Sequence, residues 1–272
     1  MRTSLSGCIS TALRRARRFS RRGDYSEAQR CFRKALRFAG KSLAFASVRP
    51  YLWNELGMAC KYSAKFDSAA RYYRLAARYA RHFEGEQRDF LLSTIYHNLG
   101  GVEHSRRRFV RAEAYARKGL ALRLRCVPGD NLAVASDRAA LAAILDGRHR
   151  RAEAERHYRF ALRIYRREYG PSHPDIAVVL NNLGALYQAL GRSKEAESSY
   201  RAALRMKRNE LGGSHPDVAV TMNNLAILCR SQGRTELARS WFKKACEILA
   251  ASLGSSHPTT QAVKRNLANT GH

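Results

Sequence analysis

The chain has 272 residues, and its 50 basic and 22 acidic residues give a formal net charge of +28. Hydrophobic residues make up 45%, but the longest apolar stretch, residues 176–191, is interrupted by Asn and Gln and is too short for a bilayer, so we expect no membrane span. The six cysteines are scattered without a CxxC pair, which excludes the usual zinc and disulfide patterns and indicates a reduced, cytoplasmic compartment.

The first predicted unit, residues 5–45, holds the strongest concentration of charge. Residues 1–45 contain 12 basic and 2 acidic residues. A run of arginines without an acid falls in the first expected helix: Arg14, Arg15, Arg17, Arg18, Arg21 and Arg22. The run predicts an anion-binding end of a groove, or alternatively an organellar presequence, because residues 1–22 are rich in Arg and Ser. Ala12, Ala16 and Phe19 fit the packing positions of later units and favour the structural interpretation.

The next two units, residues 46–88 and 89–130, place small residues at fixed positions. Gly57 and Gly100 occupy one position in the first predicted helices, and Ala69 and Ala112 occupy another in the second helices. A glycine inside a helix costs about 1 kcal/mol relative to alanine. Its repetition therefore predicts close contact between the two helices of each unit.

The fourth unit, residues 131–172, departs from the pattern. Ala139 and Ala140 stand where other units have asparagines, and Arg138 occupies a position that is usually apolar. Aligning Gly147 with Gly191 of the next unit predicts that Ala152 is the buried small residue of the second helix, equivalent to Ala69 and Ala112.

The last two full units, residues 173–214 and 215–256, repeat one phrase at an interval of 42 residues. HPDIAVVLNNLGALYQALGR begins at residue 173 and HPDVAVTMNNLAILCRSQGR at residue 215. A third, partial copy opens residues 257–272, where Val263 and Leu267 continue the apolar stripe, so we expect a C-terminal capping helix.

Each unit is predicted to form two helices. In the fifth unit, apolar residues follow i, i+3, i+4, i+7 spacing from Ile176, with Pro174 suited to the first turn and Gly191 to the end. A second helix is expected from near Ser193 to about Leu211. Since no segment shows sustained strand alternation, the predicted fold class is all-α.

The pattern Leu183-Gly184…Tyr187…Ala196…Tyr200…Ala203 resembles the tetratricopeptide repeat, and the 42-residue unit with HPD and NNL resembles the kinesin-light-chain subtype. The resemblance is strongest over residues 173–256 and good over 46–130. It implies a single right-handed solenoid of antiparallel helix pairs over residues 1–272, made of six repeats and the cap. It also implies that the first helices line a concave groove.

No enzyme motif is present, and we expect no catalytic residue, metal or cofactor. The chain contains no P-loop, dinucleotide-binding, G-x-S-x-G or H-E-x-x-H sequence. His173, His215 and His257 occupy the same position in successive repeats, so stacking separates them by roughly 8–10 Å, the spacing of packed helices. One zinc ion could not bind all three, and a role in capping helices is the better interpretation.

Polar residues opposite the apolar stripe of the first helices are the candidates for binding a peptide. Asn54, Asn181 and Asn223 share one position, and an Asn amide both donates and accepts, so a ladder of them can pair with an extended backbone. The alternative is that they bond neighbouring helices and bind nothing. The full set of groove candidates is Tyr51, Asn54, Met58, Lys61, His97, Gly101, His104, Asn181, Gln188, Asn223, Ile227 and Arg230.

These patterns predict a non-catalytic scaffold or adaptor that binds an acidic or extended segment of another protein in its groove. The alternative is sequence-tolerant binding of RNA or DNA through the basic surface, which would neutralise phosphates. The expected location is cytoplasmic, or organellar if residues 1–22 act as a presequence.

Overall fold

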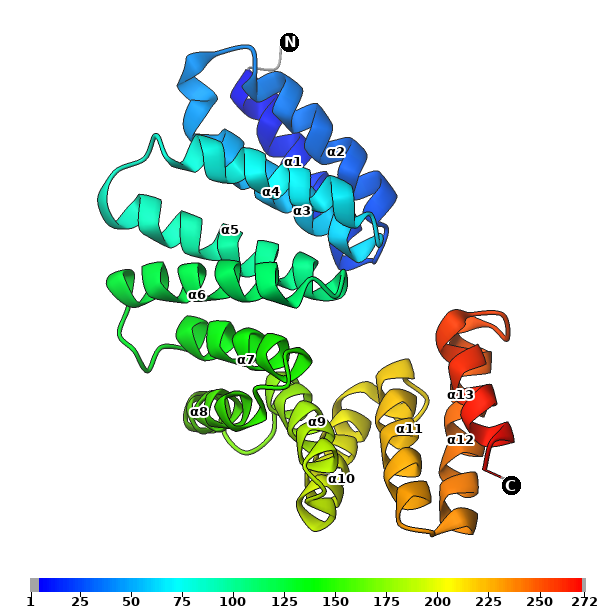
Figure 1. Cartoon of the computed structure of the whole chain (residues 1–272). Coiled ribbons are helices and arrows are strands. Elements are labelled where there is room, and N and C mark those ends of the chain that lie inside the picture. Colours follow the sequence, from blue (N-terminus) through cyan, green and yellow to red (C-terminus); the bar gives the residue numbers. More distant parts are fainter. Residues whose placement is uncertain (1–4, 271–272) are drawn as a thin grey trace. The chain divides into compact units, whose positions relative to one another are not determined.

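The computed structural model describes residues 5–270, and this part of the chain contains thirteen α-helices, one short 3-10 helix and no strand (Figure 1). The predicted all-α class of stacked helix pairs is therefore confirmed. The helices are α1 (Leu5–Arg21), α2 (Tyr25–Ala39), η1 (Leu43–Val48), α3 (Arg49–Tyr62), α4 (Phe66–Ala80), α5 (Gly85–Ser105), α6 (Phe109–Cys126), α7 (Leu132–Gly147), α8 (Arg151–Tyr169), α9 (Pro174–Ala189), α10 (Ser193–Leu211), α11 (Pro216–Ser231), α12 (Thr235–Leu253) and α13 (Pro258–Ala268).

The chain divides between His149 and Arg150 into two compact units. In the first unit α1 pairs with α2, α3 with α4 and α5 with α6, and each pair packs on the next helix along the chain. In the second unit α9 pairs with α10 and α11 with α12, while α13 packs on α12. The division lies inside the fourth repeat, and one continuous solenoid over residues 1–272 stays a prediction.

The turn inside each repeat contains one residue in the left-handed region of backbone conformation. Glycine occupies this position in the first, fifth and sixth repeats, at Gly23, Gly191 and Gly233, because it adopts positive φ without steric cost. The same position is taken by Ala64, Arg107 and His149 in the other three repeats.

The prediction for the fourth repeat was wrong by two residues. His149, rather than Gly147, is equivalent to Gly191, so the fully buried small residue is Ala154 and Ala152 is exposed. Gly147 has a different role. The ring of Phe109 lies so close that a Cβ atom on Gly147 would be 2.5 Å from it.

An aromatic side chain nine residues after the turn position fills the core of most repeats. Phe32, Tyr73, Tyr158, Tyr200 and Phe242 are all essentially inaccessible to solvent. The predicted close helix contact is confirmed where a glycine faces such a ring. A Cβ atom at Gly57 would lie 2.6 Å from the Tyr73 ring, and one at Gly184 would lie 2.6 Å from the Tyr200 ring.

Much of the acidic charge is used in ion pairs between successive repeats. Glu155 accepts from Arg192 at 2.8 Å and pairs with Arg159 on its own helix, also at 2.8 Å. Glu197 is bound in the same way by Arg234 and Arg201. The 22 acidic residues of the chain are too few to pair with all 50 basic ones.

Candidate peptide-binding face

The repeated HP sequence begins the first helix of its repeat. His173 is the N-cap of α9, and its Nδ1 accepts from the backbone N–H of Asp175 at 3.2 Å. His215 and His257 cap α11 and α13 in the same way. The interpretation of these histidines as helix caps is thereby supported. Residues 5–270 contain no group of three or more His, Cys, Asp or Glu side chains that could hold a metal ion.

The first helices of successive repeats contact one another and carry the groove candidates. In the first unit α3 contacts α5 and α5 contacts α7, and in the second unit α9 contacts α11. We call the surface formed by the groove candidates the first-helix face, and treat its two parts separately. The first-unit part consists of Tyr51, Asn54, Met58, Lys61, His97, Gly101 and His104. The second-unit part consists of Asn181, Gln188, Asn223, Ile227 and Arg230.

The asparagines of this face are hydrogen-bonded from one repeat to the next. Asn98 Nδ2 donates to Asn54 Oδ1 at 2.9 Å, and Asn224 Nδ2 donates to Asn181 Oδ1 at 3.2 Å. The cap continues the pattern, because Asn266 Nδ2 donates to Asn223 Oδ1 at 3.0 Å. The first Asn of each pair therefore accepts from the second Asn of the following repeat.

These bonds support the structural alternative for the asparagines. Each side-chain oxygen already accepts a hydrogen bond from the next repeat, and Asn181 Oδ1 accepts a second one from Thr221, so these amides offer a peptide less acceptor capacity than a free amide would. Asn181 and Asn223 are partly exposed, and their Nδ2 groups have no acceptor in the described part of the chain. A role in binding a peptide stays a prediction and would depend on these donors.

Lys61, Gly101 and His104 come together where α3 meets α5. The Lys61 ammonium lies in the space that Gly101 leaves open, since a Cβ atom on Gly101 would be 3.1 Å from Nζ. Burial lowers the pKa of Lys61. Burial also lowers the pKa of His104, with Lys61 acting in the same direction, while the Ala143 backbone and Asp146 oppose it. Both shifts disfavour the charged forms, because this corner is partly shielded from water.

His97 belongs to a polar cluster that the sequence interpretation missed. Its Nδ1 lies 2.7 Å from Asp137 Oδ1, and Arg123 Nε donates to Asp137 Oδ2 at 3.1 Å. Arg123 also donates to Thr94 Oγ1 at 3.1 Å. Asp137 and Arg123 are almost fully buried. A signal was present, since Asp137 stands at a position where the other repeats have Leu, Ile, Val or Thr.

The remaining candidates of the first unit lie at the edge of the face. Tyr51 is exposed, and its ring meets that of Phe83 edge-on at 6.4 Å. Met58 is partly buried and packs on the core. Both side chains can offer apolar contact to a bound segment.

In the second unit, two candidates are already bonded within the protein. Gln188 Oε1 accepts from the Tyr200 hydroxyl at 3.1 Å, and Arg230 donates to the backbone oxygen of Asn266 at 3.2 Å. Ile227 is partly buried. The second-unit part of the face is therefore less available to a ligand than the sequence predicts.

The structure separates the six N-terminal arginines into two groups. Arg14, Arg17, Arg18, Arg21 and Arg22 line one open pocket along α1, of about 420 Å³. Arg15 lies apart from them and lines a different pocket with residues of α2. Ala12 and Ala16 are buried, as the structural interpretation requires. None of the five arginines forms an ion pair within residues 5–270, although Arg17 acts electrostatically on Glu55.

The comparisons with known proteins agree with this architecture. Tetratricopeptide repeat models match residues 131–209, 180–251 and 92–125, which together cover more than half of the chain. The chain belongs to the tetratricopeptide repeat family. A search of the curated proteins found no match. Among the described helices of this tetratricopeptide repeat protein, none has the length and apolar character needed to cross a bilayer.

Solved structures of similar fold include kinesin-light-chain-like proteins. BtubC (BKLC) from P. vanneervenii is 24% identical with a TM-score of 0.66, and the match covers 94% of each chain. A Podosopora anserina putative kinesin light chain is 16% identical with a TM-score of 0.59, and the match covers 75% of this chain and 96% of that one. The resemblance inferred from the sequence is confirmed at the level of the fold.

A Rap protein complexed with Competence and Sporulation Factor is also similar. It is 13% identical, with a TM-score of 0.65, and the match covers 96% of this chain and 87% of that one. At such identities the likeness shows the fold alone. The family and its fold support a protein-interaction scaffold, and this class of scaffold is generally non-catalytic.

Proposed function

We propose that this tetratricopeptide repeat protein is a non-catalytic scaffold or adaptor, and that the first-unit part of its first-helix face holds an acidic, extended segment of another protein. The observation that carries the proposal is Lys61, a partly buried cation without an acidic partner among residues 5–270. A similar protein, Rap, was solved in complex with Competence and Sporulation Factor, which agrees with a scaffold of this fold binding a second molecule.

The environment of Lys61 favours a carboxylate ligand. Burying an ammonium without a counter-ion is unfavourable, and here burial lowers its pKa. His104, its neighbour across the helix interface, supplies no negative charge. A carboxylate from a bound segment would offset the desolvation of Lys61 and form a charge-assisted hydrogen bond.

The neighbouring groups suit an extended segment. Tyr51 and Met58 on α3 offer apolar contact on one side of Lys61, and Gly101 on α5 leaves room for the Lys61 ammonium itself. Further along, the partly exposed His97 ring is held by Asp137 and so presents a fixed orientation. A short peptide with acidic and apolar residues would match this sequence of groups.

The first prediction is that Lys61→Met weakens binding of acidic peptides without destabilising the fold. Met keeps most of the side-chain volume but removes the buried charge, so the free energy of unfolding should stay equal or rise. Binding of short fluorescent peptides rich in Asp and Glu should weaken about tenfold or more, because a charge-assisted hydrogen bond is lost. Fluorescence anisotropy and urea denaturation measure the two effects.

The matched control is Lys65→Met, which removes the same charge from an exposed position four residues away. It should leave binding nearly unchanged, since exposed charges contribute little. Equal losses in the two variants, or a loss of stability in Lys61→Met that explains the weaker binding, would contradict the proposal.

The second candidate function is sequence-tolerant binding of RNA or DNA, and the arginine pocket on α1 is the observation that favours it. Its lining consists of arginines alone, and the chain as a whole carries a net charge of +28. Such a surface can neutralise backbone phosphates without reading sequence.

A charge-removal variant separates the two candidates. Changing Arg14, Arg17, Arg18 and Arg21 to Gln should leave the fold intact, because all four side chains are exposed. If nucleic acid is the ligand, affinity for every oligonucleotide should fall. The slope of log K against log salt concentration should also become shallower, by about 0.7–0.9 per phosphate contact removed. If an acidic peptide is the ligand, only peptides that reach α1 should bind more weakly, and this is the result we expect.

The control removes four exposed arginines from the second unit, at Arg163, Arg166, Arg205 and Arg239. Titrations with a random oligonucleotide and with the acidic peptide at several salt concentrations provide the readout. Tight, salt-dependent oligonucleotide binding that drops only in the α1 variant would replace our first proposal with the second.

We also propose a cytoplasmic site of action. None of the six cysteines forms a disulfide within residues 5–270, in agreement with a reducing compartment. An N-terminal reporter fusion of residues 1–22 tests the organellar alternative, and import of that reporter into an organelle would contradict our assignment.

A further inference from the structure

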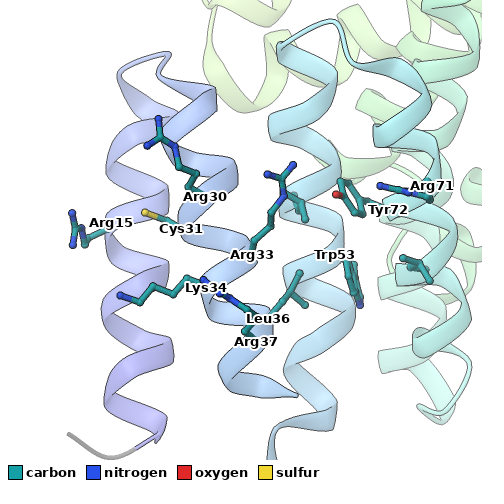
Figure 2. A pocket seen from close by; sticks show the side chains of 12 residues that line it. Arg15, Arg30, Cys31, Arg33, Lys34, Leu36, Arg37, Trp53, Arg71 and Tyr72 are labelled. Carbon is teal, nitrogen blue, oxygen red and sulfur yellow. The ribbon is translucent and has the colours of Figure 1, made fainter. Parts of the chain in front are cut away.

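A groove between the second helices of the first two repeats lies outside the first-helix face. It has a volume of about 990 Å³ and is bounded by α2 on one side and α4 on the other, with α3 contributing part of its lining. We call it the α2–α4 groove (Figure 2). Figure 2 shows Arg33 and Leu36 extending from α2 toward the side where Trp53, Tyr72 and Arg71 lie.

The charge of this groove has one sign. Its lining contains no Asp or Glu, and its basic side chains are Arg15, Arg30, Arg33, Lys34, Arg37 and Arg71. Only Arg30 has an acidic partner within residues 5–270, namely Glu27 at 2.6 Å. The four basic residues of α2 follow i, i+3, i+4, i+7 spacing and so form a stripe along one face of that helix.

The rest of the lining is apolar. Trp53 and Tyr72 stack on each other, with ring centroids 5.4 Å apart and planes 20° from parallel, and the Arg71 guanidinium lies 5.2 Å from the Tyr72 centroid. Leu36 and Leu75 are partly exposed beside them. Because Tyr72 is only 8% exposed and covers one face of Trp53, the pair offers little ring surface for stacking nucleic acid bases and is better suited to aliphatic side chains.

The second unit contains smaller grooves of the same kind. Arg159, Arg163 and Arg166 of α8 line one with apolar residues of α9, and Arg201, Arg205 and Arg208 of α10 line another beside Trp241. Their volumes are about 640 and 530 Å³. The basic stripe is thus a recurring property of the second helices, and the α2–α4 groove is the largest of these three and is basic on both sides.

We propose that the α2–α4 groove binds an acidic amphipathic helix of a partner protein. The apolar side of that helix would contact Leu36, Trp53 and Leu75, and its acidic residues would pair with Arg33, Arg37 and Arg71. The lining residues of α2 run from Arg30 to Arg37, so the groove extends for about 11 Å along this helix at 1.5 Å per residue, enough for two turns of a bound helix. Charge complementarity and an apolar floor between two helices are the features of helix-in-groove recognition.

This inference goes beyond the proposed function because it concerns a different face and a helical rather than an extended ligand. Trp53 provides a local probe. The protein has two tryptophans, so Trp241→Phe leaves Trp53 as the only one. A synthetic peptide with Leu at i, i+3, i+4 and i+7 and Glu elsewhere should change the Trp53 emission in a saturable way. A scrambled peptide of equal composition should bind much more weakly, since it presents no apolar side.

Removal of charge then tests the arginines that line the α2–α4 groove. Arg33→Gln, Arg37→Gln and Arg71→Gln together should weaken binding of the amphipathic peptide about tenfold, because three partly exposed ion pairs each contribute modestly. The matched control removes equal charge outside the groove with Arg78→Gln, Arg81→Gln and Arg111→Gln, and should retain binding. Leu75→Gln tests the apolar lining of the groove and should weaken binding as well. Circular dichroism should confirm that each variant is folded.

The experiments on the α2–α4 groove give results that can be told apart from those on the first-helix face. Lys61→Met should leave the Trp53 response unchanged, so failure of one proposal does not imply failure of the other. Peptide binding without a change in Trp53 emission would overturn the inference, as would equal loss in the two arginine variants. A single-stranded oligonucleotide that produces the same Trp53 response and competes with the peptide would also overturn it in favour of nucleic acid.

Discussion

Tyr200→Ala is expected to lower the free energy of unfolding by about 3–5 kcal/mol, the usual cost of removing a buried aromatic ring. Tyr200 is 1% exposed and fills the space between α9 and α10. Its hydroxyl also donates to Gln188, so Tyr200→Phe should cost about 1 kcal/mol by losing that hydrogen bond alone. Urea denaturation followed by circular dichroism measures both changes.

The contact between Tyr200 and Gly184 makes this prediction sharper. Gly184→Leu in the natural protein should destabilise the fold by about 1–3 kcal/mol or more, because even a Cβ atom would lie 2.6 Å from the Tyr200 ring. In the Tyr200→Ala background the same change should stabilise, since the Leu side chain can occupy the vacated volume. A double-mutant cycle in which the two changes are simply additive would show that ring and glycine do not share this space.

Removal of residues 257–272 is the second change with a large expected effect. Val263 and Thr260 are buried, and α13 packs on α12. Deleting α13 exposes the surface beneath it and should cost about 2–4 kcal/mol, from the loss of buried apolar area. The exposed end should also promote self-association, because terminal repeats of such arrays require a polar outer surface.

The deletion also breaks two polar links between α11 and α13. Asn266 donates to Asn223, and Arg230 donates to the Asn266 backbone. Asn266→Ala in the full chain isolates the first link and should cost about 1 kcal/mol. Light scattering and urea denaturation are the measurements. A shortened chain that stays monodisperse with an unchanged urea midpoint would contradict a capping role for α13.

The repeat architecture could be predicted from the sequence because its determinants are local and periodic. The spacing of apolar residues in α9 specifies a helix with one buried side, and Pro174 and Gly191 mark its two ends. The recurrence of His173, His215 and His257 at one position favours a role in capping helices, and the bond from the Asp175 N–H to His173 agrees. Such features depend on neighbours within a few residues.

The fourth repeat shows where local information was misleading. Gly147 looks like a turn glycine, but positive φ falls on His149, and the register of α8 moves by two residues. Gly147 is instead required by the ring of Phe109, which is 38 residues away in the sequence. No pattern in the surrounding residues reveals that contact.

By itself, the sequence determined the fold class, the repeat period and the ends of α9 and α10, because periodicity and turn chemistry encode them. Only the tertiary structure decided which polar groups are available for binding. The asparagine oxygens of Asn54, Asn181 and Asn223 accept from the next repeat, and Lys61 has no acidic partner among residues 5–270. Basic residues of α2 and α4 line one groove. The physical reason is that burial and pairing depend on neighbours about 42 residues away, which only the stacking of successive repeats brings together.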